Sequence, residues 1–213
     1  MEMSNTTKTE KIFEGLEYMC LIGPMESSLT PNLNCQAFIC VDGGAHLKES
    51  LPPELPCLTI GDGDSYDKAH DITYPKKKDL NDFALALKLL PKTITQIDLY
   101  GLRNGRKDHE IINIGEMLNY LDSHINLQMA SFINTESDTW LALNTGTHIL
   151  NFVGTFTVIT LQKQKITIAG EALYKGEDIT LNVLTSQGLS NQASGSFTIE
   201  CQKPVLVMRS QGE

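Results

Sequence analysis

The sequence predicts an α/β N-terminal domain with a mainly parallel sheet, followed by a smaller all-β, sandwich-like C-terminal domain. Up to about residue 133, short apolar runs alternate with helix-like segments, which is typical of parallel α/β layering. Helical periodicity then disappears, and β-rich segments are separated by Gly, Asn and Ser, as in all-β modules. We place the predicted boundary at residue 140, which gives domains of residues 1–140 and 141–213.

The first predicted strands are the apolar runs at residues 18–22, 37–41 and 57–60. A helix is predicted over residues 82–90, because apolar side chains recur there at i, i+3, i+4 and i+7. These side chains are Phe83, Ala86, Leu87 and Leu90. Asp82 is available as the cap of this helix, and Pro91 closes it.

A strand at residues 96–100 and a turn rich in Gly and Asn precede a second predicted helix over about residues 108–120. Its expected apolar side consists of Ile111, Ile114, Gly115, Leu118 and Leu121. Residues 127–132 are the next predicted strand. The β-rich segments of the C-terminal domain are residues 156–161, 165–169, 178–183, 197–201 and 205–208. A domain this small usually needs a partner surface.

The composition narrows the possible functions. The formal net charge of -9 argues against a nucleic-acid partner, because such proteins gather Lys and Arg on one face. An acidic enzyme still binds a polyphosphate when a divalent metal supplies positive charge. No apolar run reaches a membrane span, and the five cysteines contain no C-x-x-C pair. We therefore expect reduced thiols, no membrane partner and a cytoplasmic location.

Two acidic loops follow predicted strands. Asp42 comes directly after the second strand and is followed by Gly43 and Gly44. Glycines at this position let a phosphate approach the backbone, although a tight turn with an exposed acid is the alternative. Asp62 and Asp64 follow the third strand at i and i+2. This spacing suits magnesium, which takes one or two carboxylates together with phosphate oxygens and water; the alternative is a polar surface turn.

The third segment runs from Lys76 to Asp82, with three lysines ahead of the predicted helix. Asp82 either caps that helix or completes a metal site, and Lys78 is either solvated or reaches a triphosphate. The sequence leaves both readings open.

The fourth segment, residues 101–109, joins a strand to the second helix and contains Arg106, Asp108 and His109. Arg106 is suited to grip phosphate oxygens, and Asp108 to cap the helix or assist an acceptor hydroxyl. His109 is more often a packed residue than a catalyst. All four segments lie in the same half of the chain. Because the carboxyl ends of parallel strands share one edge of a sheet, we expect a single ligand site there.

Motifs for P-loop, dinucleotide-binding and nucleophile-elbow proteins are absent from the sequence. The ordered set Asp-Gly-Gly-Ala from residue 42, Gly-Asp-x-Asp-Ser from residue 61, Lys-Asp-x-x-Asp-Phe from residue 78 and Gly-Arg-x-Asp-His from residue 105 resembles the thiamin pyrophosphokinase (thiamin diphosphokinase) family. Residues 188–191, 195–196 and 203–206 resemble the thiamin-side segment of that family.

The resemblance implies transfer of the pyrophosphoryl group of ATP to the hydroxyl of thiamin, giving thiamin diphosphate and AMP. It implies Mg²⁺ as cofactor, ATP as co-substrate, and a homodimer with active sites between the first domain of one subunit and the second domain of the other. The implied magnesium ligands are Asp62, Asp64 and Asp82, with Asp42 and Asp108 completing the catalytic acidic cluster. The implied nucleotide- and thiamin-binding residues are Gly43, Gly44, Lys78, Arg106, Ser190 and Asn191.

Several positions depart from the family pattern, and they bear mainly on the acceptor. They are His46, Gly63, Asn81 and Asn104, together with the absence of a C-terminal Trp near Val207. Two alternatives therefore stand beside the thiamin reaction. One is a related diphosphokinase acting on another heterocyclic alcohol, such as a pterin. The other is a non-catalytic homologue that binds thiamin or a nucleotide.

Overall fold

The computed structural model describes residues 12–26, 34–135 and 138–210. By its internal contacts the chain divides into two compact units, residues 1–117 and 118–213. Among the described residues, no helix is long and apolar enough to cross a membrane. All five cysteines are free thiols, as the sequence predicts.

The predicted fold class is wrong. The described chain is mostly β, with twelve strands in a mixed sheet and 19% of the residues helical. The prediction assumed helical connections between the strands of the first half and a separate small sandwich after it. The connection after Gly61 instead consists of bends without an apolar stripe, and the second half contributes long antiparallel strands that dominate the secondary structure.

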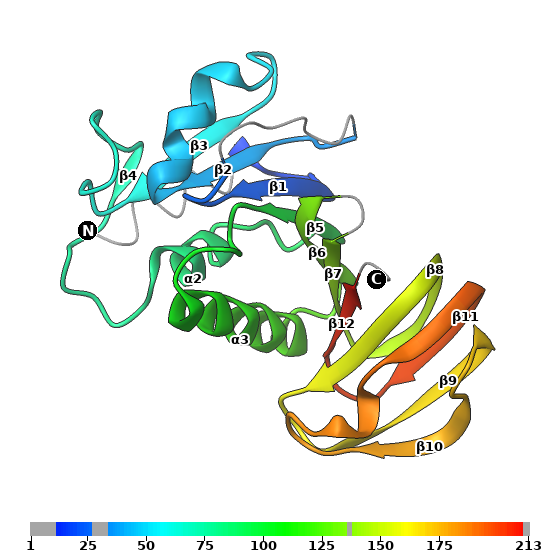
Figure 1. The fold of residues 1–213 in the computed structure, drawn as a ribbon. Helices are drawn as coiled ribbons and strands as arrows, with labels where there is room; N and C mark the ends of the chain where they lie inside the picture. Colours follow the sequence, from blue (N-terminus) through cyan, green and yellow to red (C-terminus); the bar gives the residue numbers. More distant parts are fainter. Residues whose placement is uncertain (1–11, 27–33, 136–137, 211–213) are drawn as a thin grey trace. The chain divides into compact units, whose positions relative to one another are not determined.

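The first unit contains five parallel strands: β1 (Tyr18–Ile22), β2 (Phe38–Val41), β3 (Cys57–Gly61), β4 (Ile72–Thr73) and β5 (Gln96–Tyr100). They pair in the order β5-β1-β2-β3-β4 (Figure 1). The predicted bounds of β1 and β5 are confirmed. Apolar side chains fill both faces of β1 and β2, which is why these strands are continuous apolar runs rather than alternating ones.

Helix α2 (Asp82–Leu87) begins one residue after its cap, and that cap is Asn81. The Asn81 side-chain oxygen accepts a hydrogen bond from the Ala84 amide at 2.7 Å. The suggestion that Asp82 caps the helix is therefore wrong. Because an asparagine at this position is a good cap, the Asp82 carboxylate is available for other contacts.

Helix α3 (Lys107–Ser123) is confirmed, but its first turn faces the opposite way from the prediction. Ile111 is 66% exposed, whereas Glu110 and Asn113 are each 7% exposed. The inward stripe starts with these two polar residues and becomes apolar only at Met117 and Leu121. The periodicity argument assumed an apolar stripe along the whole helix, and it fails where the helix borders a polar pocket.

The second unit is a set of antiparallel strands: β6 (Met129–Thr135), β7 (Asp138–Leu143), β8 (Gly146–Thr160), β9 (Gln164–Ala172), β10 (Gly176–Leu181), β11 (Asn191–Cys201) and β12 (Val205–Ser210). A short 3-10 turn, η2 (Ser186–Gly188), precedes β11. The rings of Phe156 and Phe197 stack with centroids 4.7 Å apart within the core of this unit. Alternating inward side chains on β8 and β11 build that core.

Candidate functional site

The carboxyl ends of the parallel strands border one pocket of about 450 Å³ in the first unit. Pro24 follows β1, Asp42 follows β2, Asp62 follows β3 and Gly101 follows β5, and all four residues line it. The remaining lining residues are Met25, Val41, Asp64, Ser65, Asn81, Asp82, Phe83, Leu102, Gly105, Arg106, His109, Glu110 and Asn113. The structure thus brings residues of all four predicted segments to one pocket at this edge of the sheet.

Asp42 is the first residue of η1 (Asp42–Ser50) and has a φ of 49°. Left-handed backbone is unusual for a residue with a side chain, and aspartate is among the few that adopt it. Gly44 allows the turn to lie against β1, because a Cβ there would be 2.2 Å from the Ile22 carbonyl oxygen. Close packing against β1 thus explains the glycine at position 44. Neither Gly43 nor Gly44, which were expected to bind the ligand, lines the pocket.

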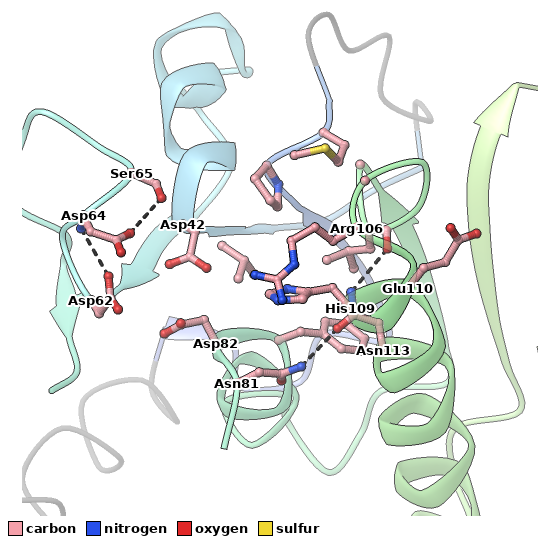
Figure 2. A pocket seen from close by; sticks show the side chains of 17 residues that line it. Asp42, Asp62, Asp64, Ser65, Asn81, Asp82, Arg106, His109, Glu110 and Asn113 are labelled. Atoms are coloured by element: carbon pink, nitrogen blue, oxygen red, sulfur yellow. Dashed lines mark hydrogen bonds between the residues drawn. The ribbon is translucent and has the colours of Figure 1, made fainter. Parts of the chain in front are cut away.

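The Asp42 carboxyl is held among other acids, as Figure 2 shows. The pKa of Asp42 is raised to about 7. Burial is the largest cause, and the nearby carboxylates of Asp82 and Asp62 add to it. A carboxyl in this state indicates negative charge that is only partly neutralised by the protein. Such a cluster favours a bound cation.

The Asp62 loop is shaped by its own carboxylates. Asp62 Oδ1 accepts a hydrogen bond from the Asp64 amide at 3.1 Å, and Asp64 Oδ1 accepts one from the Ser65 hydroxyl at 2.8 Å (Figure 2). The hydrogen bond from the Ser65 hydroxyl is the largest cause that holds the pKa of Asp64 below its usual range, so this exposed carboxyl is ionised near neutral pH. Both carboxylates remain on the pocket wall.

Lys78 supplies a positive charge to this cluster. Its Nζ lies 2.9 Å from Asp82 Oδ2 and 3.8 Å from Asp62 Oδ2. The three side chains are 11% to 16% exposed, so their charges interact with little screening by water. Asp82 Oδ1 is buried and accepts no hydrogen bond. One oxygen of Asp82 therefore remains available to a ligand.

Arg106 lines the pocket opposite the acids, whereas Asp108 does not line it. The Arg106 guanidinium donates to both carboxylate oxygens of Asp108, with Nε at 3.2 Å and Nη2 at 2.5 Å. Both side chains are largely exposed. The structure thus does not bring Asp108 into the acidic cluster; it places Asp108 where it orients Arg106.

Sequence reasoning missed several polar residues of the pocket wall. Asn81 Nδ2 donates to Asn113 Oδ1 at 3.1 Å, and Asn113 Nδ2 donates to the Leu102 carbonyl at 3.2 Å. Glu110 accepts a hydrogen bond from Lys107 at 2.9 Å. The signal that would have found them is the polar pair at i and i+3 near the start of α3. His109, which the sequence suggested was more often a packed or hydrogen-bonded residue than a catalyst, lies on the pocket wall with an exposed side chain.

The two predicted thiamin-side residues belong to the second unit, and neither lines this pocket. Ser190 has a φ of 56°, and its amide donates to the Thr157 hydroxyl. Asn191 is 5% exposed. Its side-chain oxygen accepts a hydrogen bond from the Tyr174 amide at 2.9 Å, and its side-chain nitrogen donates one to the Tyr174 carbonyl at 2.8 Å. Asn191 therefore clamps the turn after β9.

The donors present fit a magnesium ion only in part. Among the described residues, no three His, Cys, Asp or Glu side chains are grouped closely enough to hold a metal ion. Magnesium commonly takes one or two carboxylates and completes its shell with phosphate and water. The unpartnered Asp82 oxygen and the neighbouring Asp62 carboxylate match that requirement, although Lys78 is paired with both residues in this structure.

A family model matches the segment of the chain that supplies most of this pocket. Residues 32–129 match the model of the thiamin pyrophosphokinase catalytic domain. This stretch contains Asp42, the Asp62 loop, Asp82 and Arg106. A search of curated proteins finds no match.

Solved structures resemble the chain along most of its length. The thiamine pyrophosphokinase from Bacillus subtilis is 19% identical, with 92% of this chain and all of that chain covered and a TM-score of 0.69. The enzyme from Geobacillus thermodenitrificans is 19% identical, with 92% and 98% covered and a TM-score of 0.70. The enzyme from Candida albicans is 17% identical, with 91% and 90% covered and a TM-score of 0.69. At these identities the likeness establishes a shared fold.

The family is one of kinase-type transferases that bind thiamin and use ATP as co-substrate. The motifs quoted from the first half of the chain and the family model fall on the same segment, which supplies most of the residues that line the acidic pocket. The resemblance predicted from the sequence is confirmed: residues 32–129 match the thiamin pyrophosphokinase catalytic domain, and structures of thiamin pyrophosphokinases share the fold.

Proposed function

We propose that this protein is a thiamin diphosphokinase that transfers the pyrophosphoryl group of ATP to the hydroxyl of thiamin. The observation that carries the proposal is the meeting of Asp42, Asp62, Asp64 and Asp82 with Arg106 around one pocket, within the segment that matches the family's catalytic domain. Carboxylates that hold a metal and cations that hold phosphates are the parts that phosphoryl transfer requires.

In the proposed reaction the thiamin hydroxyl oxygen forms a bond to the β-phosphorus of ATP. The bond from that phosphorus to the oxygen bridging it to the α-phosphorus breaks, and its electron pair leaves with AMP. The hydroxyl proton is released, and the products are thiamin diphosphate and AMP. Such transfers depend on positioning and charge neutralisation rather than on covalent help from the protein.

We assign Asp62, Asp64 and Asp82 to Mg²⁺, which when bound neutralises the phosphate charge and orients the reacting phosphorus. Asp42 completes the acidic cluster, in keeping with its burial beside Asp82 and Asp62. Lys78 and Arg106 contact the phosphates. In this assignment Lys78 exchanges a carboxylate partner for a phosphate oxygen when the metal–nucleotide complex binds.

Asp108 keeps a supporting part in the proposal: its paired hydrogen bonds orient the Arg106 guanidinium. Gly43 and Gly44 form the turn that places Asp42, and Ser190 and Asn191 belong to the thiamin side. Because these last two residues lie outside the pocket of their own first unit, we propose a homodimer in which they face the partner's pocket. The free thiols are compatible with a cytoplasmic location, which we also propose.

The transfer is tested with ATP labelled at a single phosphorus. Label in the β or γ position is expected to appear in thiamin diphosphate, and label in the α position to remain in AMP. Label passing from the γ position alone would instead indicate a simple kinase. Replacing thiamin with a hydroxymethyl pterin tests the second acceptor class, which the altered Asn81 and Asn104 positions leave open.

The dimer is tested by complementation. Asp62→Asn damages the first unit, and Ser190→Trp obstructs the thiamin side, so each variant alone is expected to be inactive. Mixed subunits recover one intact site if a site draws on two chains. Sedimentation of the native protein as a monomer, together with no recovery of activity, would contradict the proposed assembly.

A further inference from the structure

His70 is a buried histidine whose two ring nitrogens have no hydrogen-bond partner in the described structure. The residue is 7% exposed and lies between the Asp62 loop and β4. Its ring packs against Tyr66 with centroids 5.2 Å apart. Buried polar atoms are nearly always hydrogen-bonded, and a bound ion or water is one of the explanations for an exception. The family motifs do not include this histidine.

The Nε2 atom of His70 and the carboxylate of Asp42 face the same small gap above Gly61. A Cβ on Gly61 would lie 2.6 Å from His70 Nε2 and 2.6 Å from Asp42 Oδ1. The two atoms are thus no more than twice that distance apart, and the missing side chain of Gly61 keeps the space between them open. Gly61 immediately precedes Asp62, so the gap adjoins the acidic cluster.

We propose that His70 Nε2 and the Asp42 carboxylate form a binding subsite for a divalent transition-metal cation, of which Mn²⁺ and Co²⁺ are representatives. The proposal rests on the proposed function, because it concerns the cation used at the same pocket. It adds a nitrogen ligand to a site whose other donors are oxygens. Because the described residues contain no group of three His, Cys, Asp or Glu side chains that could hold a metal ion, the cation completes its coordination with water or phosphate oxygens.

The chemistry of the two donors favours such a cation over magnesium. Imidazole binds transition metals well, whereas magnesium prefers oxygen ligands. Metal ligation requires the neutral imidazole. Burial lowers the pKa of His70, although Asp82, Asp62 and Asp71 act in the opposite direction. The net effect keeps the ring neutral at physiological pH, and the nearby carboxylates attract a cation.

The test uses Mn²⁺ alone as the probe, with electron spin echo spectroscopy to detect nitrogen bound to the metal. The native protein is expected to show the nitrogen modulation of a coordinated imidazole. His70→Phe keeps a ring against Tyr66 but removes the ligand, so the modulation is expected to disappear and Mn²⁺ affinity to fall about tenfold or more. Magnesium affinity is expected to change by less than about twofold, because that ion does not use the nitrogen.

Two further variants make the test independent of one substitution. Gly61→Ala fills the gap without removing a donor, and it is expected to reproduce the loss of modulation seen in His70→Phe. His109→Gln removes the exposed imidazole of the pocket wall and is expected to leave the modulation unchanged. Circular dichroism of each variant establishes that it is folded before metal is added.

The outcomes separate this inference from the proposed function. Mn²⁺ binding that depends on Asp62 and Asp82 but shows no nitrogen modulation in the native protein would overturn the His70 subsite and leave the proposed function standing. Modulation that persists in His70→Phe and vanishes in His109→Gln would also overturn it. Thiamin-dependent formation of AMP is measured separately with Mg²⁺, so failure of that reaction is distinguishable from failure of the subsite.

Discussion

Lys78 Nζ lies 2.9 Å from Asp82 Oδ2, and the same ammonium group lies 3.8 Å from Asp62 Oδ2. The lysine therefore neutralises two of the proposed magnesium ligands from within the chain. This pairing reduces the repulsion between the two carboxylates when no metal is bound. In the proposed function, this lysine contacts the phosphates that bind together with the metal.

The first prediction concerns Lys78→Met. Without divalent cation, this change leaves two little-exposed carboxylates without their positive partner, and we expect a loss of about 1 to 3 kcal/mol in the free energy of unfolding. Added Mg²⁺ is expected to recover most of that loss. Urea denaturation with and without Mg²⁺ measures both values. Lys77→Met, at the exposed neighbouring position, is the control, and an equal loss in the control would contradict the assignment.

The second prediction concerns the metal ligands. Asp62→Asn and Asp82→Asn each keep the size of the side chain but remove its charge, so we expect kcat to fall by at least about a hundredfold. Circular dichroism is expected to be unchanged. Asp67→Asn, an exposed acid outside the pocket, is the matched control and should retain activity. Turnover near the native rate in both ligand variants would rule out the metal assignment.

The third prediction concerns the cap of α2. Asn81→Ala removes the bond to the Ala84 amide, and we expect the free energy of unfolding to drop by about 1 kcal/mol. Asn81→Ser retains a capping oxygen and should lose less than about half of that. Thermal or urea unfolding measures the difference. Equal stability of the alanine variant and the native protein would mean that Asp82 or another group supplies the cap.

The fourth prediction concerns the pH dependence of the metal-free protein. Burial and the neighbouring acids raise the pKa of Asp42 from 3.8 to about 7 in the folded state. The folded protein thus keeps a proton that the unfolded chain releases. The stability this provides is complete below about pH 3.8 and is lost as the pH rises to about 7. Asp42→Asn lacks this titration.

The difference in melting temperature between the native protein and Asp42→Asn is the quantity to measure, in the absence of divalent cations. We expect the native protein to lose stability relative to the variant across that pH interval. A difference that stays constant over the interval would show that Asp42 is not perturbed by its neighbours.

The sequence predicts the strands of the first unit well, and the reason lies in their composition. Tyr18–Ile22 and Gln96–Tyr100 are short apolar runs between polar segments, and the predicted and observed bounds coincide. The meeting of Asp42 with Asp62 was predictable too, because both follow parallel strands. Periodicity could not predict which polar side chain caps α2 and which one pairs with Lys78. Asn81 caps α2, and this leaves Asp82 to Lys78.

Other features depend on tertiary packing that a local pattern does not encode. Ile111 faces solvent because Glu110 and Asn113 occupy the inner side of α3 next to the pocket. The fold class was misjudged because connections were assumed to be helical where the chain forms bends and further strands. His70 belongs to none of the motifs found in the sequence. Its candidate role follows from its burial next to Gly61 in the structure. The division into residues 1–140 and 141–213 stays a prediction.

The most direct test of the central claim is to separate the products formed from ATP, thiamin and Mg²⁺ by chromatography. Controls lack thiamin, lack metal or contain Asp62→Asn. We predict thiamin diphosphate and AMP in equal amounts, both dependent on thiamin and metal and both absent with the variant. Formation of ADP with thiamin monophosphate, or no thiamin-dependent product from folded protein that binds ATP, would contradict the proposed function.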